Sequence, residues 1–133
     1  ENLVALCAQN DILVSAIPGP CAAITALSIS GQSTGRFCFE GFLSTSKKSR
    51  REHLESLQEE QRTMIFYEAP HKLVATLESM AEVFGGDRPI SLCRELTKLH
   101  EEVIRGTAAE LNAIKRDWKG EFVIGIAAVK ALQ

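Results

Sequence analysis

Apolar residues along this chain fall into short runs separated by polar and glycine-containing turns, a pattern typical of alternating strands and helices. The near-continuous apolar run at 122–129 predicts a strand covered on both faces, at the centre of its sheet. Residues 90–94 instead alternate between apolar and polar, as a half-covered strand does. The strands that we predict are 12–17, which we expect to be buried, 37–42, 64–67, 90–94, 103–106 and 121–129.

The clearest helix is predicted at 70–84, where apolar residues recur at spacings of four, three and four. Pro70 suits its first position, where a missing N–H costs nothing, and Gly85 suits its end. Residues 68–71 therefore lie on a turn between the strand at 64–67 and this helix. In open α/β sheets such turns bind ligands, although an ordinary solvated loop has the same local pattern.

Other helices are indicated by small residues and by capping pairs. Residues 21–29 are rich in alanine and serine, which allow a ligand or a second helix to approach closely. Ser49 with Glu52, and Thr107 with Glu110, have the spacing of capping boxes and predict two further helix starts.

The order of these elements predicts an α/β fold with a mixed, mostly parallel sheet flanked by helices. Crossovers of helix length join strands that run in the same direction, so they favour parallel neighbours. The short link near 95–103 permits an antiparallel pair.

The composition is typical of a globular domain, and the net charge does not indicate general affinity for nucleic acid. The 133 residues are 45% hydrophobic and carry a formal net charge of −2. Any basic surface must therefore be local. Lys47, Lys48, Arg50 and Arg51 form such a cluster, which predicts either a phosphate-binding site or a solvated helix start.

The sequence contains no sign of a membrane or metal protein. No apolar run approaches the roughly 20 residues that a membrane-spanning helix needs, and no signal peptide is visible, so we expect a cytoplasmic location. The four cysteines lack C-x-x-C spacing and the three histidines are scattered, so we expect no metal. The chain opens without Met inside an apparent helix, and we expect it to be a piece of a longer protein.

Five short blocks of sequence carry a resemblance to a known family. They occur in one order and cover nearly the whole chain. The blocks are 17–23 (IPGPCAA), 39–42 (FEGF), 66–71 (FYEAPH), 93–98 (CRELTK) and 119–123 (KGEFV). Together they resemble the C-terminal portion of small-subunit ribosomal RNA methyltransferases, a branch of the tetrapyrrole (corrin/porphyrin) methylase superfamily.

The resemblance implies an S-adenosylmethionine-dependent enzyme of two α/β domains with the cofactor between them. Residues 1–30 would be the end of the N-terminal domain and the crossover, and 31–133 the C-terminal domain. With half of the cofactor site outside the chain, we expect no activity from it alone. The cofactor-binding residues that the resemblance implies are Cys21, Ala22, Ala23, Tyr67, Glu68, Ala69, Gly106 and Thr107.

The implied reaction is 2′-O-methylation of a cytidine in 16S ribosomal RNA, with a homodimer as the expected assembly. A ribose hydroxyl is a poor nucleophile, so we expect a base or an orienting group, and Glu68 and His71 are the candidates. The expected RNA-binding residues are Lys47, Lys48, Arg50, Arg51, Arg94, Glu95 and Lys98.

Two other functions remain open from the sequence. One is methylation of a tetrapyrrole, which the basic cluster and the RELTK block disfavour. The other is a non-catalytic half that serves RNA docking and dimerisation.

Overall fold

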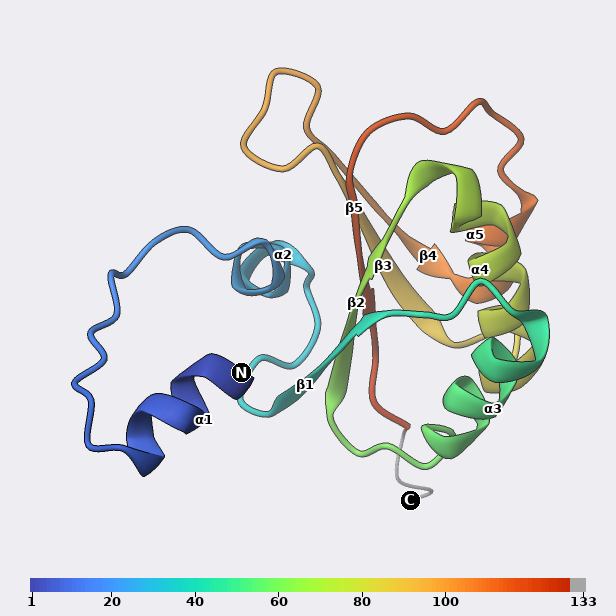
Figure 1. Ribbon diagram of the computed structural model, residues 1–133. Coiled ribbons are helices and arrows are strands. Elements are labelled where there is room, and N and C mark those ends of the chain that lie inside the picture. The colour runs from blue at the N-terminus through green and yellow to red at the C-terminus, as the bar shows by residue number, and fades with distance from the viewer. Residues whose placement is uncertain (130–133) are drawn as a thin grey trace.

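The computed structural model describes residues 1–129 and contains one sheet with helices on both of its faces (Figure 1). The strands are β1 (Phe37–Phe42), β2 (Thr63–Glu68), β3 (Pro89–Arg94), β4 (Glu102–Thr107) and β5 (Phe122–Ile126). The helices are α1 (Asn2–Gln9), α2 (Ala22–Ile29), α3 (Lys47–Ser56), α4 (Pro70–Phe84) and α5 (Ala108–Ala113). None of these helices has the length and apolar character that a membrane crossing requires.

The strand order is β1-β2-β5-β3-β4, which confirms an α/β fold with a mixed sheet. The prediction of a mostly parallel sheet is wrong, because only β1 and β2 pair in parallel and the other three neighbouring pairs are antiparallel. The helical crossovers do return β1, β2 and β3 in the same direction. However, β5 inserts between β2 and β3 and runs against both, so β2 and β3 share a direction without being neighbours.

The predicted buried strand at 12–17 is also wrong. Residues 11–20 are all exposed and adopt no strand, with Leu13 90% exposed and Ile17 95% exposed. A strand needs a paired neighbour, and this segment runs beside α1, away from the sheet (Figure 1). The predicted division of the chain near residue 30 stays a prediction, although α2 packs directly on the sheet.

The two faces of the sheet are covered unequally. Helices α3, α4 and α5 cover one face, and its core contains the largest buried side chains, including Phe66, Leu77 and Ile124. Among residues 1–129, the helix that packs on the other face is α2, whose Ala23, Ala26 and Leu27 form a smaller apolar cluster with the sheet. The small side chains of α2 pack on β2 and β5 rather than on a second helix, and the approach of a ligand to this helix stays a prediction.

The unit β2–α4 forms as its sequence predicts. Pro70 is the first residue of α4, Ala69 is its N-cap, and Gly85 ends it with a φ of +91°, in the region that favours glycine. The capping box of Thr107 and Glu110 is confirmed at the start of α5. The predicted box at Ser49 is wrong, because α3 begins earlier and the hydroxyl of Ser46 accepts the N–H of Ser49.

Candidate functional site

A pocket of about 370 Å³ lies where β1 and β2 end and β5 begins. Because β5 runs antiparallel to β2, its first residues lie beside the last residues of β2, with Glu68 opposite Phe122. The pocket therefore gathers segments that are far apart in the sequence. Its lining consists of Ala22, Phe42, Tyr67, Glu68, Ala69, Pro70, Gly120, Glu121, Phe122 and Val123.

Helix α2 meets β2 at one wall of this pocket. The backbone N–H of Ala23 donates to the hydroxyl of Tyr67 at 3.1 Å, which ties the first turn of α2 to the strand. The ring of Tyr67 meets those of Phe39 and Phe42 edge to face, with centroids 4.9 and 5.7 Å apart. Ala22 lines the pocket, Ala23 is buried behind it, and Cys21 is the exposed N-cap of α2.

Glu68 is only 3% exposed, so the alternative of an ordinary solvated loop does not hold for this residue. Its carboxylate accepts the N–H of Ala69 at 2.8 Å and the hydroxyl of Thr76 at 2.7 Å. The ammonium of Lys72 lies 3.5 Å from the same carboxylate. These contacts fix the first two turns of α4 against the end of β2, which indicates a structural task for Glu68.

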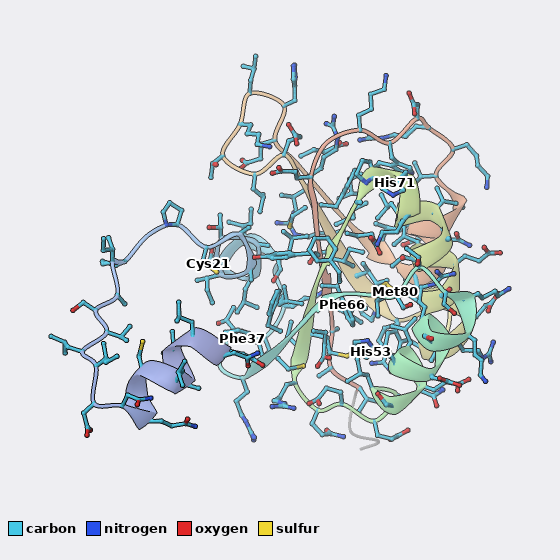
Figure 2. The ribbon with its side chains drawn as sticks, in the orientation of Figure 1. Cys21, Phe37, His53, Phe66, His71 and Met80 are labelled. Atoms are coloured by element: carbon cyan, nitrogen blue, oxygen red, sulfur yellow. The ribbon has the colours of Figure 1, made fainter. Side chains whose placement is uncertain are left out.

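His71 is exposed at the second position of α4 and does not line the pocket. Figure 2 places it near the start of α4, well apart from Cys21 at the start of α2. The structure therefore brings Glu68, but not His71, into the pocket wall. A catalytic role for either residue stays a prediction.

Gly106 and Thr107 lie at the opposite end of the sheet, where Gly106 pairs with Ile90. They line a second cavity of about 370 Å³ together with Gln32 and Arg105. Strand β4 runs antiparallel to β3, so its last residues point away from the edge at which β1, β2 and β3 end. The predicted cofactor-binding residues therefore lie at two ends of the sheet. This geometry does not indicate a single ligand that contacts all of them.

Charged side chains next to the first pocket form a small network. Glu95 accepts the backbone N–H of Glu121 at 2.8 Å, and Lys98 donates to the carboxylates of Glu95 and Glu121 at 3.2 and 2.9 Å. The backbone hydrogen bond from Glu121 and the ammonium of Lys98 lower the pKa of Glu95. The carboxylates of Glu121 and Glu95 raise the pKa of Lys98. Both predicted RNA-binding residues are thus charged at neutral pH and lie beside the pocket.

Arg94 continues this network at the end of β3. Its guanidinium donates to the backbone oxygens of Lys119 and His100, and lies 3.8 Å from the carboxylate of Glu102. The side chain therefore joins the link between β3 and β4 to the segment that leads into β5.

The predicted basic cluster on α3 separates into different environments. Arg50 is 7% exposed and its guanidinium donates to the hydroxyl of Ser79 on α4 at 2.9 Å, so it is not free to contact RNA. Arg51 pairs with Glu55 at 2.7 Å, and Lys48 lies 3.9 Å from Glu52. Lys47 is exposed at the start of the helix.

Sequence reasoning missed several residues of the pocket wall. The residues of the wall that were not predicted are Phe42, Pro70, Gly120, Glu121, Phe122 and Val123. The block KGEFV was one of the five that carried the family resemblance, so a signal was present. This block lies beside β2 because β5 inserts antiparallel to β2, and the block alone does not reveal that pairing. Across residues 1–129, no group of three or more His, Cys, Asp or Glu side chains is gathered to hold a metal ion.

Comparison with protein-family models matches residues 1–112 to the tetrapyrrole (corrin/porphyrin) methylases. Three curated relatives named ribosomal RNA small subunit methyltransferase I illustrate the similarity. The relative from Mycobacterium tuberculosis (strain CDC 1551 / Oshkosh) is 50% identical over 83% of this chain and 39% of its own length. The relative from Synechocystis sp. is 47% identical over 96% and 46%, and that from Escherichia coli O157:H7 is 45% identical over 98% and 47%. The chain thus spans less than half the length of these relatives.

Solved structures share the fold at much lower identity. The methyltransferase CobJ superposes with a TM-score of 0.68 at 18% identity, over 98% of this chain and 57% of its own. A uroporphyrin-III-C-methyltransferase from Thermus thermophilus gives 0.64 at 16% identity, over 95% and 56%. A diphthine synthase gives 0.66 at 12% identity, over 95% and 53%. At these identities the likeness extends to the fold alone.

Proposed function

The chain belongs to the tetrapyrrole (corrin/porphyrin) methylase family, and from this premise we propose that it forms part of an S-adenosylmethionine-dependent methyltransferase acting on small-subunit ribosomal RNA. The observation that carries the proposal is the contrast in identity. Relatives named for ribosomal RNA methylation are 45–50% identical over most of the chain, whereas the tetrapyrrole and diphthine enzymes with this fold are 12–18% identical. The proposed product is a 2′-O-methyl cytidine in 16S ribosomal RNA.

The pocket at the ends of β1 and β2 fits one wall of a cofactor site. Its volume of about 370 Å³ lies in the range of small-molecule pockets, and its lining is mostly apolar. Ala22, Tyr67 and Ala69 would hold the cofactor there. When bound, S-adenosylmethionine supplies an electrophilic methyl group. Gly106 and Thr107 would belong to this site only through a ligand that reaches the other end of the sheet.

The residues of this chain have distinct tasks in the proposed reaction. Glu68 orients the start of α4 and holds Lys72 at the pocket, since its carboxylate is already occupied by Ala69 and Thr76. His71, exposed on the same turn, is available to orient or deprotonate the ribose hydroxyl. Lys98 is available to RNA phosphates at the opposite rim.

Phosphate contacts further from the pocket would come from the exposed cations of α3. Lys47, Lys48 and Arg51 carry this part of the proposal, and Arg50 does not because it is buried. The proposal includes a cytoplasmic location, since ribosomal subunits are the expected substrate. It also includes the expected homodimer.

The proposal is tested by methyl transfer from labelled S-adenosylmethionine, using the full-length protein with small ribosomal subunits or with uroporphyrinogen as acceptor. We expect label in the RNA only, at a cytidine whose 3′ phosphodiester resists alkaline hydrolysis because its 2′-oxygen is methylated. Transfer to the macrocycle but not to RNA would establish the tetrapyrrole alternative. A full-length protein that binds RNA yet transfers no methyl group would leave the non-catalytic docking function.

A further inference from the structure

An exposed phenylalanine and a half-buried lysine lie together at the mouth of the pocket. Phe42 ends β1, lines the pocket and is 61% exposed. The ammonium of Lys72 lies 5.8 Å from the centroid of its ring. Neither residue was among the site residues expected from the sequence.

The backbone of β1 is shaped to put Phe42 in this position. Partners run in step from Phe37 to Phe39, and the register then shifts so that Gly41 pairs with Phe66 and Phe42 with Tyr67. Gly41 has a φ of +69°, which a side chain at this position would strain. The bulge sets Phe42 on the same face as Phe39, and both rings meet Tyr67 edge to face.

Lys72 is held in place but retains donors for a ligand. Its side chain is 23% exposed, and its ammonium lies 3.5 Å from the buried carboxylate of Glu68. That carboxylate already accepts hydrogen bonds from Ala69 and Thr76. An ammonium has three N–H donors, and one ion pair of this length does not use them all. A positioned cation thus stands next to an exposed aromatic ring.

We propose that Phe42 and Lys72 form a clamp for the target nucleotide of the RNA substrate, with the base stacked on Phe42 and a phosphate oxygen bound by Lys72. The clamp rests on the proposed function. A base can stack on the exposed ring of Phe42 only after it has left its own stack, so the clamp takes an unstacked nucleotide. Proteins hold unstacked bases on exposed aromatic rings and their backbones with cations.

The clamp is tested in the full-length protein with small ribosomal subunits as substrate. We expect Phe42→Ala to raise the KM for subunits on the order of 10-fold, a larger factor than that by which it raises the dissociation constant of S-adenosylmethionine. Phe42→Trp should retain the wild-type KM because it keeps a ring to stack on. Phe37→Ala is the matched control, since Phe37 is also exposed on β1 but does not line the pocket.

Lys72 needs a paired variant because it is the counter-ion of a buried carboxylate. We expect the double variant Glu68→Gln and Lys72→Gln, compared with Glu68→Gln alone, to lower the slope of log affinity for RNA against log salt by about 1. An unchanged slope would show that Lys72 meets no phosphate, and the clamp would lose its cation.

Several results separate the clamp from the proposed function. A wild-type KM and melting temperature for Phe42→Ala, in a protein that methylates RNA, overturn the clamp alone. A weaker affinity for S-adenosylmethionine with an unchanged KM assigns Phe42 to the cofactor wall, and early melting assigns it to contact with another part of the protein; both overturn the clamp. Transfer of methyl groups only to uroporphyrinogen by the wild type overturns the proposed function itself.

Discussion

Glu68 and His71 have similar sequence contexts but different environments in the structure. Both are polar residues at the end of a strand, and their sequence context makes them equal candidates. The structure separates them, because one side chain is buried among donors and the other faces solvent. Burial of a carboxylate depends on partners such as Thr76, eight residues away on the next helix, which local pattern does not reveal.

Substitution of these two residues should therefore have unequal effects on stability. Glu68→Ala leaves the hydroxyl of Thr76 and the ammonium of Lys72 without their partner, and we expect it to lower the free energy of unfolding by about 3 kcal/mol. His71→Ala should change it by less than about 0.5 kcal/mol. Urea denaturation of the two variants measures both values. Equal, small losses in the free energy of unfolding would show that the side chain of Glu68 is exposed rather than buried.

The cysteines should differ in their reactivity toward alkylating reagents. Burial raises the pKa of Cys93 to about 11, so almost none of it is thiolate at pH 8. Cys21 is exposed at the N-cap of α2, next to the pocket residue Ala22, so it should react first and bound S-adenosylmethionine should slow its reaction. Mass spectrometry after timed alkylation of the full-length protein identifies the modified residue. Alkylation of Cys21 at the same rate with and without S-adenosylmethionine would remove it from the cofactor wall.

At the scale of elements, most helices and strands follow from the sequence while their neighbours in the sheet do not. The apolar spacing over 70–84, Pro70 and Gly85 predict α4 because each acts within a few residues. The central, covered position of β5 also follows from its apolar run. Its insertion between β2 and β3 does not, because pairing across the sheet is decided by contacts between distant segments. The prediction of a strand at 12–17 failed for the same reason, since its apolar pattern does not show whether a neighbouring strand pairs with it.

Helix α4 provides the strongest test of the predicted core. Leu77 is 1% exposed in the main cluster, and Leu77→Ala should lower the free energy of unfolding by about 2–5 kcal/mol through lost burial and a residual cavity. Val74→Ala on the same helix is the control, because Val74 is 52% exposed and should lose less than about 1 kcal/mol. Denaturant titration compares them, and similar losses would show that the stripe was assigned wrongly.

Strand β4 should be less firmly held at acid pH. The guanidinium of Arg116 donates to the carboxylate of Glu102 at 2.9 Å and lowers the pKa of Glu102 below its usual 4.5. The folded state therefore binds this proton less tightly than the unfolded state, so the stabilisation is complete above pH 4.5 and is lost as the pH falls through the lowered pKa.

Glu102→Gln should accordingly flatten part of the decline in stability below pH 4.5. Thermal melting of both proteins across the acid range measures the change. Parallel curves would show that the contact of Glu102 with Arg116 adds nothing to stability in solution.

At the scale of the whole molecule, the cofactor-binding residues that the sequence resemblance implies fall into two groups at opposite ends of the sheet. Ala22, Tyr67, Glu68 and Ala69 were predicted together and do line one cavity. Gly106 and Thr107 were predicted to bind the same cofactor, but they lie at the other end of the sheet. The sequence motifs do not reveal the direction in which β4 runs, so they could not separate these residues from the first group. The apolar side chains left exposed on α1 and at 12–17 add surface that this chain does not cover itself.

The central claim is that the pocket at the ends of β1 and β2 holds S-adenosylmethionine. Hydrogen exchange of the full-length protein, followed by mass spectrometry with and without S-adenosylmethionine, tests it most directly. The account predicts slower exchange in peptides that cover 21–23, 67–70 and 119–123, and unchanged exchange at 105–108. Protection confined to 105–108, or saturating binding without protection of the three pocket segments, would contradict it.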